Sequence, residues 1–410
     1  MENVWEILKE RGFVYQCTDE DAMNNVLAKE PVTFYVGFDP TGNSLHIGHL
    51  LPVMAMRWLQ KCGHRPLALV GGGTAMIGDP SGKTTARPIM TVEEIDYNVS
   101  CLQGQLSRFL DFSDGKAVMV NNGEWLRGLK FLDFLRDIGS LFSVNKMMTA
   151  ESVKMRLETG LSFLEFSYPL LQAFDFATLN KKYGCRFEFG GQDQWGNIVA
   201  GVDLTRRLNN AEVYGATFPL LLKSDGTKFG KTAGGAVWLD PNRTSPFDYY
   251  QFWRNVEDSE VTKLLGLFTA LPMDEVRRLG ALEAPFINRS KEILAYEATA
   301  LAHGHDAAAK AYQAAGGEFG FADPDGKIAT SSRIAEVAAN ADEAIPSVTL
   351  NAEEFGSDGI GILALFVKAG LCGSNGDARR LVKGGGCYMN DVRIDNERLV
   401  LTVSDFASGS

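Results

Sequence analysis

The chain lacks the features that mark membrane proteins, metal-bound proteins and disulfide-stapled proteins. No apolar run approaches the roughly 20 residues that a membrane-spanning helix needs. The six cysteines are widely spaced and include no Cys-x-x-Cys pair, which argues against a zinc site and against a disulfide framework. The N-terminus has neither the basic start of a secretory signal nor the Arg/Ser bias of a transit peptide. We therefore expect a cytoplasmic protein with no membrane partner and no dedicated metal site.

The chain also has fewer positive than negative residues. The formal net charge is −11, from 40 Lys and Arg against 51 Asp and Glu. Phosphate contacts need clustered Lys and Arg, so this balance argues against general nucleic-acid binding and against DNA as a partner. An RNA partner would have to meet a local basic surface. The length of 410 residues predicts two or three domains.

The first half of the chain alternates short β-rich runs with amphipathic helices. This pattern indicates βαβ units and a doubly wound, Rossmann-type parallel sheet in an α/β domain. A Thr-x-x-Glu capping box at Thr91 and Glu94 starts the clearest helix. The expected strands are Val32 to Val36, Leu67 to Val70, Ala117 to Val120 and Arg186 to Phe189.

Helical periodicity replaces the strand signal in two later stretches. Residues 126–178 read as helices inserted between the halves of the sheet, and residues 245–316 read as a second helical region. The Gly, Asp and Pro of residues 316–330 indicate a linker or an exposed loop. A third, small α+β domain follows residue 345, with a helix near Asp377 to Val382 and a hairpin turning at Asn390-Asp391.

The most informative segment runs from Tyr35 through Gly37-Phe38-Asp39-Pro40-Thr41 into His46-Ile47-Gly48-His49. It reads as a strand, a Gly/Pro turn and a helix start, with Ser44 or Asn43 placed to cap the helix. A helix N-terminus offers unpaired backbone N–H groups and a positive dipole end, so it binds anions. His46 and His49 lie on one face of the first turn, and Gly48 leaves room for a flat group to approach. We expect a nucleotide here.

Two histidines on a helix face are by themselves more often a capped surface turn or half a metal site. The full string HIGH after a strand and Asp-Pro-Thr is more specific, and it resembles the nucleotide-binding signature of class I aminoacyl-tRNA synthetases. Their second signature, a loop with two lysines, is matched in the correct order by Lys228-Phe229-Gly230-Lys231-Thr232. Further segments resemble the bacterial tyrosyl-tRNA synthetases in particular: GFDPT, IGDPSGK, SYPLLQAFDF, GGQDQWGNI and SPFDYYQFWRN.

The resemblance covers nearly the whole chain and implies its domains and its reaction. It implies a catalytic domain at 1–232 whose inserted helices, about 126–178, form a homodimer interface. An α-helical anticodon-side domain with its linker would occupy 233–330, and an RNA-binding domain of ribosomal-protein type 345–410. The implied enzyme is a tyrosine–tRNA ligase, which activates L-tyrosine with ATP and transfers it to the 3′-terminal adenosine of its tRNA.

The resemblance also implies a tyrosine pocket. Tyr35 and Asp175 match the pair that binds the phenol, and Asp79 matches the residue that holds the ammonium group. Tyr168, Gln172 and Asp175 fall on one helical face, and Gln194 matches a further substrate contact. Phenylalanine would leave the buried polar groups of such a pocket unpaired.

The remaining site residues are implied on the nucleotide side. Thr41, His46, Lys228 and Lys231 would stabilise charge on the phosphates, with Mg²⁺ bound to the nucleotide, and His49 and Asp39 would hold the nucleotide. Gly37 and Gly48 would lie against ATP, and Gly191 and Asp193 would face its ribose or adenine. The tyrosine carboxylate is the nucleophile, so the reaction needs no general base.

Several features depart from the pattern or are set aside. Glu188 stands where the family commonly has glutamine, so its contact is left open. The turn at Gly78 to Thr84 has the wrong glycine spacing for a P-loop. His64 reads as a helix cap, and His303-Gly304-His305 as an exposed helix end.

The C-terminal segment resembles a small RNA-binding fold, in which Arg379, Arg380, Lys383 and Arg393 would contact phosphates. Nearby Asp377, Asp391 and Asp395 dilute this patch. Three other functions stay open at this point: a tryptophanyl-tRNA synthetase, a nucleotidylyltransferase that shares the H-x-G-H turn, and a structural RNA-binding factor without catalysis.

Overall fold

The computed structural model describes residues 3–81, 90–157, 160–222, 229–232, 235–337, 351, 355, 359–384, 387–389, 392–394, 396–402 and 405. The chain divides into two compact units, Met1–Ala341 and Asp342–Ser410. Within the described residues no helix is both long enough and apolar enough to cross a membrane.

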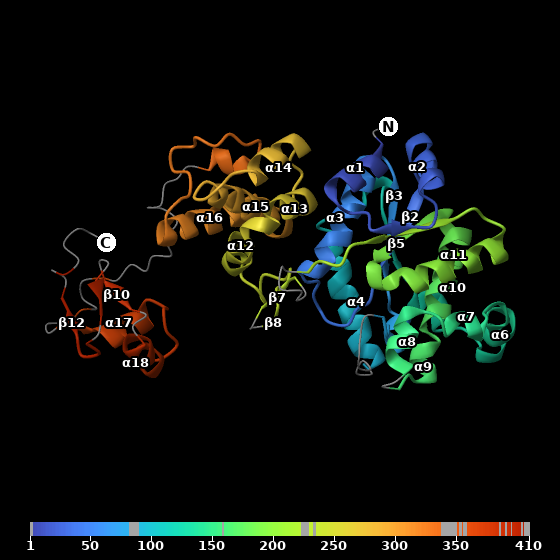
Figure 1. The fold of residues 1–410 in the computed structure, drawn as a ribbon. Helices are drawn as coiled ribbons and strands as arrows, with labels where there is room; N and C mark the ends of the chain where they lie inside the picture. Colours follow the sequence, from blue (N-terminus) through green and yellow to red (C-terminus); the bar gives the residue numbers. More distant parts are fainter. Residues whose placement is uncertain are drawn as a thin grey trace. The chain divides into compact units, whose positions relative to one another are not determined.

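A six-stranded sheet is the centre of the first unit (Figure 1). The strand order is β1-β6-β5-β2-β3-β4, and all neighbours are parallel except β1, which runs antiparallel to β6. The expected strands are confirmed, while β1 and β6 were not predicted. The strands are β1 (Gln16–Cys17), β2 (Thr33–Phe38), β3 (Arg65–Val70), β4 (Val118–Asn121), β5 (Cys185–Gly191) and β6 (Tyr214–Phe218).

Helices cover both faces of the sheet, which confirms the doubly wound α/β fold. Phe34, Val36 and Phe38 of β2 join the core beneath the N-terminal helices, whereas Tyr35 packs on the opposite face with residues of the later helices. This alternation is the period of two that a strand imposes. The first face carries α1 (Val4–Arg11), α2 (Glu20–Lys29), α3 (Ile47–Lys61) and α4 (Val92–Leu106), and the second carries α10 (Tyr168–Tyr183) and α11 (Trp195–Asn209).

The chain order reverses at β2, because β3 follows on one side of it and β5 lies on the other. At such a switch point the loops leave the carboxyl ends of neighbouring strands in opposite directions and open a crevice for a ligand. The expected insertion between β4 and β5 is helical. It contains α5 (Gly123–Leu126), α6 (Phe131–Asp137), α7 (Val144–Met147), α8 (Glu151–Leu157) and α9 (Phe163–Phe166).

The rest of the first unit is helical, as expected. A short hairpin comes first, made of β7 (Lys231–Thr232) and β8 (Gly235–Ala236). Five helices follow: α12 (Pro246–Arg254), α13 (Val261–Phe268), α14 (Met273–Gly280), α15 (Ile287–His303) and α16 (His305–Phe319).

The segment expected as a linker or an exposed loop is an ordered loop that packs on these helices. Glu275 of α14 accepts hydrogen bonds from Thr330 and Ser331, and the backbone N–H of Ala322 donates to Glu292 of α15. The contact boundary therefore falls after residue 341 rather than near residue 330. The finer division of the first unit at residue 232 stays a prediction.

Three local expectations had different outcomes. The N-cap of α3 is His46, not Ser44 or Asn43. The expected cap at His64 is confirmed: its backbone N–H donates to the carbonyl of Leu59 in the last turn of α3, and its buried ring accepts through Nδ1 from the backbone N–H of Val32. The exposed helix end expected at residues 303–305 is confirmed in part: α15 ends at His303, and Gly304 and His305 are exposed, but the His303 ring is half-buried and packs edge-on against Tyr249.

The second unit contains the expected helix and hairpin. The helix is α18 (Asn375–Lys383), and the hairpin pairs β10 (Tyr388–Met389) with β11 (Val392–Arg393) in the expected register. Its turn residues Asn390 and Asp391 lie outside the described residues. The unit also contains α17 (Ile362–Lys368) and the paired strands β9 (Ile360–Gly361) and β12 (Val400–Leu401).

Candidate active site

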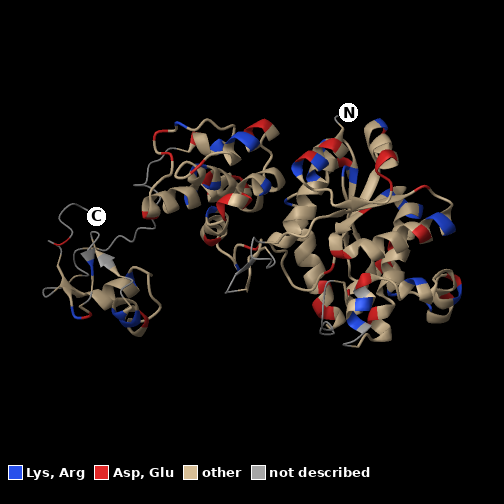
Figure 2. Cartoon of the chain, in the orientation of Figure 1, with Lys and Arg blue, Asp and Glu red and all other residues tan. Residues whose placement is uncertain are grey.

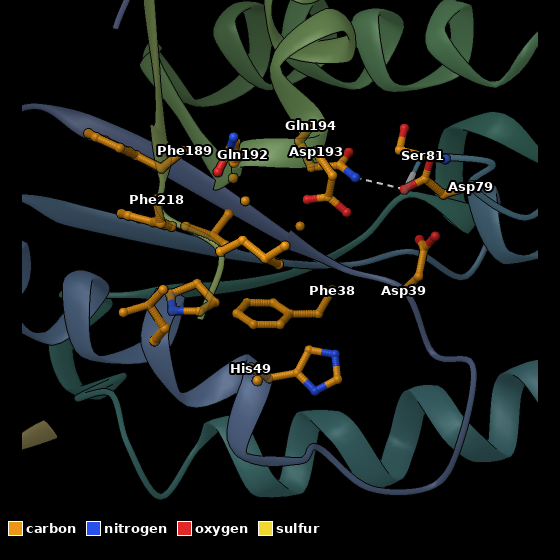
Figure 3. A pocket seen from close by; sticks show the side chains of 18 of the residues that line it. Phe38, Asp39, His49, Asp79, Ser81, Phe189, Gln192, Asp193, Gln194 and Phe218 are labelled. Carbon is orange, nitrogen blue, oxygen red and sulfur yellow. Dashed lines mark hydrogen bonds between the residues drawn. The ribbon is translucent and has the colours of Figure 1, made fainter. Parts of the chain in front are cut away.

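A cavity of about 380 Å³ opens at the carboxyl ends of β2 and β5 (Figure 3). Its wall contains every residue with a described side chain that was expected to contact tyrosine or ATP. These are Tyr35, Gly37, Asp39, Thr41, His46, Gly48, His49, Asp79, Tyr168, Gln172, Asp175, Gly191, Asp193 and Gln194. The sheet therefore gathers segments that are far apart in the sequence.

Lys228 and the side chain of Lys231 lie outside the described residues. The described part of their loop, however, runs past the start of α3. The backbone N–H of Val237 donates to the carbonyl of Gly230, and that of Ile47 donates to Val237. Gly230 adopts φ +84°, and a Cβ there would come within 3.3 Å of Ile47. The two signature segments are therefore adjacent.

The two histidines of the first signature form a capping box at the N-terminus of α3. The backbone N–H of Gly48 donates to Nδ1 of His46 at 3.0 Å, and the backbone N–H of His46 donates to Nδ1 of His49 at 3.1 Å. Their ring centroids are 4.0 Å apart. Because each Nδ1 accepts, each neutral ring carries its hydrogen on Nε2, where it can donate to an anionic oxygen.

Gly48 is required by this arrangement. A Cβ at position 48 would lie 2.8 Å from Cε1 of the His46 ring, closer than real carbon atoms approach. The expected reason for glycine was room for a ligand, and the structure adds room for the capping histidine. Together with the helix dipole, the Nε2–H groups make this end of the cavity suitable for phosphates.

The opposite part of the cavity is acidic. Asp39, Asp79, Asp175, Glu188 and Asp193 line it, and no Lys or Arg does so among the lining residues that the structure describes. Asp79 accepts from the backbone N–H of Ser81 at 2.9 Å and from Nε2 of Gln194 at 2.7 Å (Figure 3). Fixed carboxylates of this kind favour a substrate with a positive group, such as an ammonium.

Asp39 is also held in place. Its two oxygens accept from the hydroxyls of Thr74 at 2.9 Å and of Tyr168 at 3.0 Å. Burial, with the nearby carboxylates of Asp39 and Asp79, raises the pKa of Tyr168 well above its usual value, so this phenol keeps its hydrogen and remains a donor.

Asp175 is buried, with 1% of its surface exposed, and both of its oxygens are hydrogen-bonded. Nδ2 of Asn122 donates to one oxygen at 2.8 Å, and Nε1 of Trp125 donates to the other at 2.7 Å. Burial raises the pKa of Asp175 to about 8, although these two donors favour the ionised form. Sequence analysis missed Asn122 and Trp125, whose only signal was the Asn-Asn-Gly turn after β4.

A second chain of hydrogen bonds crosses the same wall. Nδ2 of Asn197 donates to Oε1 of Gln172 at 3.0 Å, and Nε2 of Gln172 donates to Oε1 of Glu188 at 2.9 Å. Tyr35 and Glu188 are register partners on β2 and β5, and both are about 1% exposed. Burial raises the pKa of Glu188 to about 7.

The basic residues expected in the second unit are exposed on α18 and β11, and Figure 2 colours the positive residues of this unit blue. Three of these basic side chains form ion pairs with acidic residues. Arg380 pairs with Asp377, while Arg379 and Lys383 each lie 3.4 Å from Glu397. Asp377 thus dilutes the patch as expected, and Glu397 is an additional acid that the sequence analysis missed.

Comparison with known proteins agrees with this geometry. The family described as tRNA synthetases class I (W and Y) matches residues 27–319. A tyrosine–tRNA ligase of Clostridium botulinum (strain Loch Maree / Type A3) is 51% identical over 98% of this chain and 94% of its own length. The tyrosine–tRNA ligase of Clostridium tetani (strain Massachusetts / E88) is 50% identical over 100% of this chain and 95% of its own length.

Among solved structures, the C-terminally truncated mitochondrial tyrosyl-tRNA synthetase of Aspergillus nidulans aligns with a TM-score of 0.69. The sequence identity is 31%, and the alignment covers 76% of this chain and 93% of that one. The family match and the full-length relatives lead to one conclusion. The chain belongs to the class I tRNA synthetases for tryptophan and tyrosine, and within them to the bacterial tyrosyl-tRNA synthetases.

Proposed function

We propose that the cavity at the carboxyl ends of β2 and β5 carries out both steps of the tyrosine–tRNA ligase reaction. One observation carries this proposal: a single cavity joins a helix N-terminus with two Nε2–H donors to an acidic, buried wall. The first end suits a triphosphate and the second suits a tyrosine, so the two substrates would meet between them.

The acidic wall supports an assignment of tyrosine contacts. Asp79, held by Ser81 and Gln194, would accept from the α-ammonium, together with Tyr168 and Gln172 at the same wall. The phenol would reach Tyr35 and Asp175. Asp175 already has two donors, yet each carboxylate oxygen keeps a lone pair that can accept the phenol hydrogen. Tryptophan offers no hydroxyl to this pair, which disfavours the tryptophan alternative.

Activation would require positioning rather than acid–base chemistry. The tyrosine carboxylate attacks the α-phosphorus of ATP, the bond to the β-phosphate oxygen breaks, and pyrophosphate leaves with tyrosyl-adenylate remaining. Thr41, His46, Lys228 and Lys231 would stabilise the growing negative charge, which is how preorganised donors accelerate phosphate chemistry. Gly37, Asp39, Gly48, His49, Gly191 and Asp193 would hold the nucleotide.

Mg²⁺ would be bound by the phosphates of the nucleotide, whose oxygens are the ligands that it prefers. Its chemistry is to neutralise phosphate charge. Within the described part of the chain, no group of three acidic, His or Cys side chains lies close enough together to hold a metal. The chain's own contribution would therefore be the placement of the nucleotide.

Transfer of tyrosine to the tRNA would follow in the same cavity. A ribose hydroxyl of the 3′-terminal adenosine attacks the tyrosyl carbonyl, and AMP leaves with its electron pair. The second unit would bind the tRNA through Arg379, Arg380, Lys383 and Arg393, which are exposed. Their ion pairs with Asp377 and Glu397 would be exchanged for phosphate contacts.

The inserted helices support a homodimer. They expose large apolar side chains, which soluble monomers rarely gather in one region: Phe131, Leu132, Leu135, Val144, Met148, Met155, Phe163 and Leu164. A second copy of the chain would cover them. Sedimentation at micromolar concentration should give the mass of a dimer, and a monomer at all concentrations would contradict this assignment.

Both chemical steps can be followed in one experiment in which each enzyme molecule reacts once. The enzyme is mixed with tyrosine, Mg²⁺ and ATP labelled at the α-phosphate, and bound tyrosyl-adenylate is measured before and after tRNA is added. The proposal predicts an adenylate that accumulates and then disappears as labelled AMP and tyrosyl-tRNA form. An adenylate that tRNA does not discharge would remove the transfer step, and an absence of adenylate would favour the non-catalytic RNA-binding alternative.

A further inference from the structure

Glu188 occupies an unusual position in the cavity wall. Its Oε1 accepts from Gln172, but its Oε2 is buried and has no hydrogen-bond partner among the described residues. The hydroxyl of Tyr35, its neighbour across β2 and β5, is also buried without such a partner. The two side chains act on each other, because hydrogen bonding between them raises the pKa of Tyr35 and opposes the rise in the pKa of Glu188. Each is therefore the available protein partner of the other at the wall of a ligand cavity.

The direction of each hydrogen bond around Glu188 is fixed. Asn197 donates to the amide oxygen of Gln172, so Gln172 must present its NH₂ group to Oε1 of Glu188. Oε1 faces a donor, so a hydrogen on this carboxyl must sit on Oε2, which is also the oxygen left without a partner among the described residues. If Oε2 is ionised it accepts the Tyr35 hydrogen, and if it is protonated it donates to the Tyr35 oxygen.

These two states have opposite consequences for a bound phenol. An ionised Glu188 captures the only hydrogen of Tyr35, so the phenol oxygen loses its donor. A protonated Glu188 leaves that hydrogen to the substrate. Three hydrogen bonds then form in series: Glu188 to Tyr35, Tyr35 to the phenol, and the phenol to Asp175.

We propose that Glu188 is a positioning residue for tyrosine: its carboxyl, protonated on Oε2, donates to the oxygen of Tyr35 and so directs the Tyr35 hydroxyl to the phenol of the substrate. This inference rests on the proposed function of Tyr35 and Asp175. It gives Glu188 an effect on tyrosine affinity without any contact to the reacting atoms.

The charges around Glu188 support this state. Among the described residues, the ionisable groups that interact with it are Tyr35 of β2, Asp175 of α10 and Cys185 of its own strand. On the other two sides, α11 approaches with Gly201 and β6 with Gly215, neither of which titrates. All three are acids. A negative charge on Asp175 or Cys185 would oppose ionisation of Glu188, whereas a hydrogen bond from Tyr35 favours it and holds the pKa of Glu188 below what burial alone would give.

Of the two buried carboxyls, Asp175 and Glu188, it is Glu188 that carries a proton once tyrosine is bound. Burial raises the pKa of Asp175 to about 8 and that of Glu188 to about 7, and each negative charge opposes the other. Asp175 would receive a third donor from the phenol, in addition to Asn122 and Trp125, which lowers its pKa in the complex. Glu188 gains no donor from the substrate.

The test measures tyrosine-dependent exchange of pyrophosphate into ATP by the whole enzyme from pH 6 to pH 9. The wild-type KM for tyrosine should rise about tenfold as Glu188 ionises, the loss that one hydrogen bond implies, while kcat changes little. The matched variant is Glu188→Gln, whose amide donates to Tyr35 at every pH. Its KM should lack this rise, and the ratio of the two profiles removes the titration of the substrate's own ammonium.

A second variant keeps the test decisive if Glu188→Gln does not fold. Tyr35→Phe removes the group that Glu188 directs, so its KM should be high and should lack the Glu188-dependent rise. Parallel profiles in the wild type and in either variant would overturn the role of Glu188 while leaving tyrosine activation intact. A wild-type chain without tyrosine-dependent exchange at any pH would instead contradict the proposed function itself.

Discussion

The buried carboxyl of Glu188 links the cavity to the stability of the fold. Its pKa is raised by burial from 4.5 to about 7, so the folded chain binds more protons than the unfolded chain between these values. Stability is therefore lost as the pH rises through this window. Glu188→Gln removes the titration and should be more stable than the wild type at pH 8, by about 3 kcal/mol or several degrees in Tm.

The measurement is thermal unfolding of both proteins at pH 5 and pH 8. The difference in Tm between the two proteins should be small at pH 5, where Glu188 is neutral, and larger at pH 8. A gap that does not change with pH would show that the carboxyl does not titrate as its burial implies.

The two donors to Asp175 provide a second residue-scale prediction. Trp125→Phe keeps the aromatic ring but removes the Nε1–H that binds Asp175 at 2.7 Å. A less well held carboxylate should weaken tyrosine binding, raising the KM for tyrosine in the exchange assay about tenfold. Trp5→Phe makes the same chemical change in the core away from the cavity and should leave the KM as it is. Equal effects of both substitutions would contradict the account.

At the scale of single residues, the sequence predicted which side chains line the cavity but not how they are held. Tyr35, Asp79 and Asp175 were found because they match motifs. Asn122 and Trp125 follow the end of β4, and only the fold brings them to Asp175. Hydrogen bonds between residues so far apart in the chain depend on tertiary geometry, which local sequence patterns do not contain.

At the scale of elements, the start of α3 combines capping and chemistry in one residue. His46 caps the helix through Nδ1 and offers Nε2 to a phosphate. The sequence favoured Ser44 or Asn43, because these residue types cap most helices. Ser44 instead is buried, and its hydroxyl accepts from Nε2 of Gln105 on α4 while donating to the carbonyl of Leu45. Tertiary contacts therefore overrode the local preference.

Substitution of His46 can separate the two roles. His46→Asn retains a good cap but lacks the Nε2 donor, whereas His46→Ala lacks both. If phosphate stabilisation is the main role, both variants should lower kcat for tyrosine activation roughly 100-fold, with much smaller changes in tyrosine affinity. Pre-steady-state adenylate formation would measure both quantities. Recovery of the rate in His46→Asn would mean that His46 acts only as a cap.

Whole strands and helices were the most predictable features. β2, β3 and β5 carry dense apolar and aromatic residues, and α4 begins at its capping box as expected. β1 and β6 were missed because β1 has only two residues, and β6 contains a glycine and an alanine, which are depleted in strands. Gly215 has a structural reason: a Cβ there would lie 2.2 Å from Ile198.

At the scale of the whole molecule, the boundary between the two units guides a truncation. A chain ending at Ala341 retains the loop that packs on α14 and α15, and it should retain pyrophosphate exchange. Loss of the second unit should reduce tyrosine transfer to tRNA at least 100-fold, because its phosphate contacts are removed. Parallel exchange and charging assays check this, and unchanged charging would exclude a tRNA-binding role for the second unit.

A chain ending at residue 330 is the informative comparison. It lacks Ser331, which donates to Glu275, and Ser332, which donates to Glu297. Glu275 is largely buried, so losing these donors should lower the Tm of this chain below that of the longer truncation. Equal melting temperatures would mean that the loop does not stabilise the helical part.

The central claim is that this cavity activates tyrosine. The most direct test is amino-acid-dependent exchange of labelled pyrophosphate into ATP, with tyrosine, tryptophan and phenylalanine compared at equal concentration. We predict rapid exchange with tyrosine and none above background with the other two, because only tyrosine presents a hydroxyl to Tyr35 and Asp175. Comparable exchange with phenylalanine, or exchange with tryptophan alone, would contradict the account.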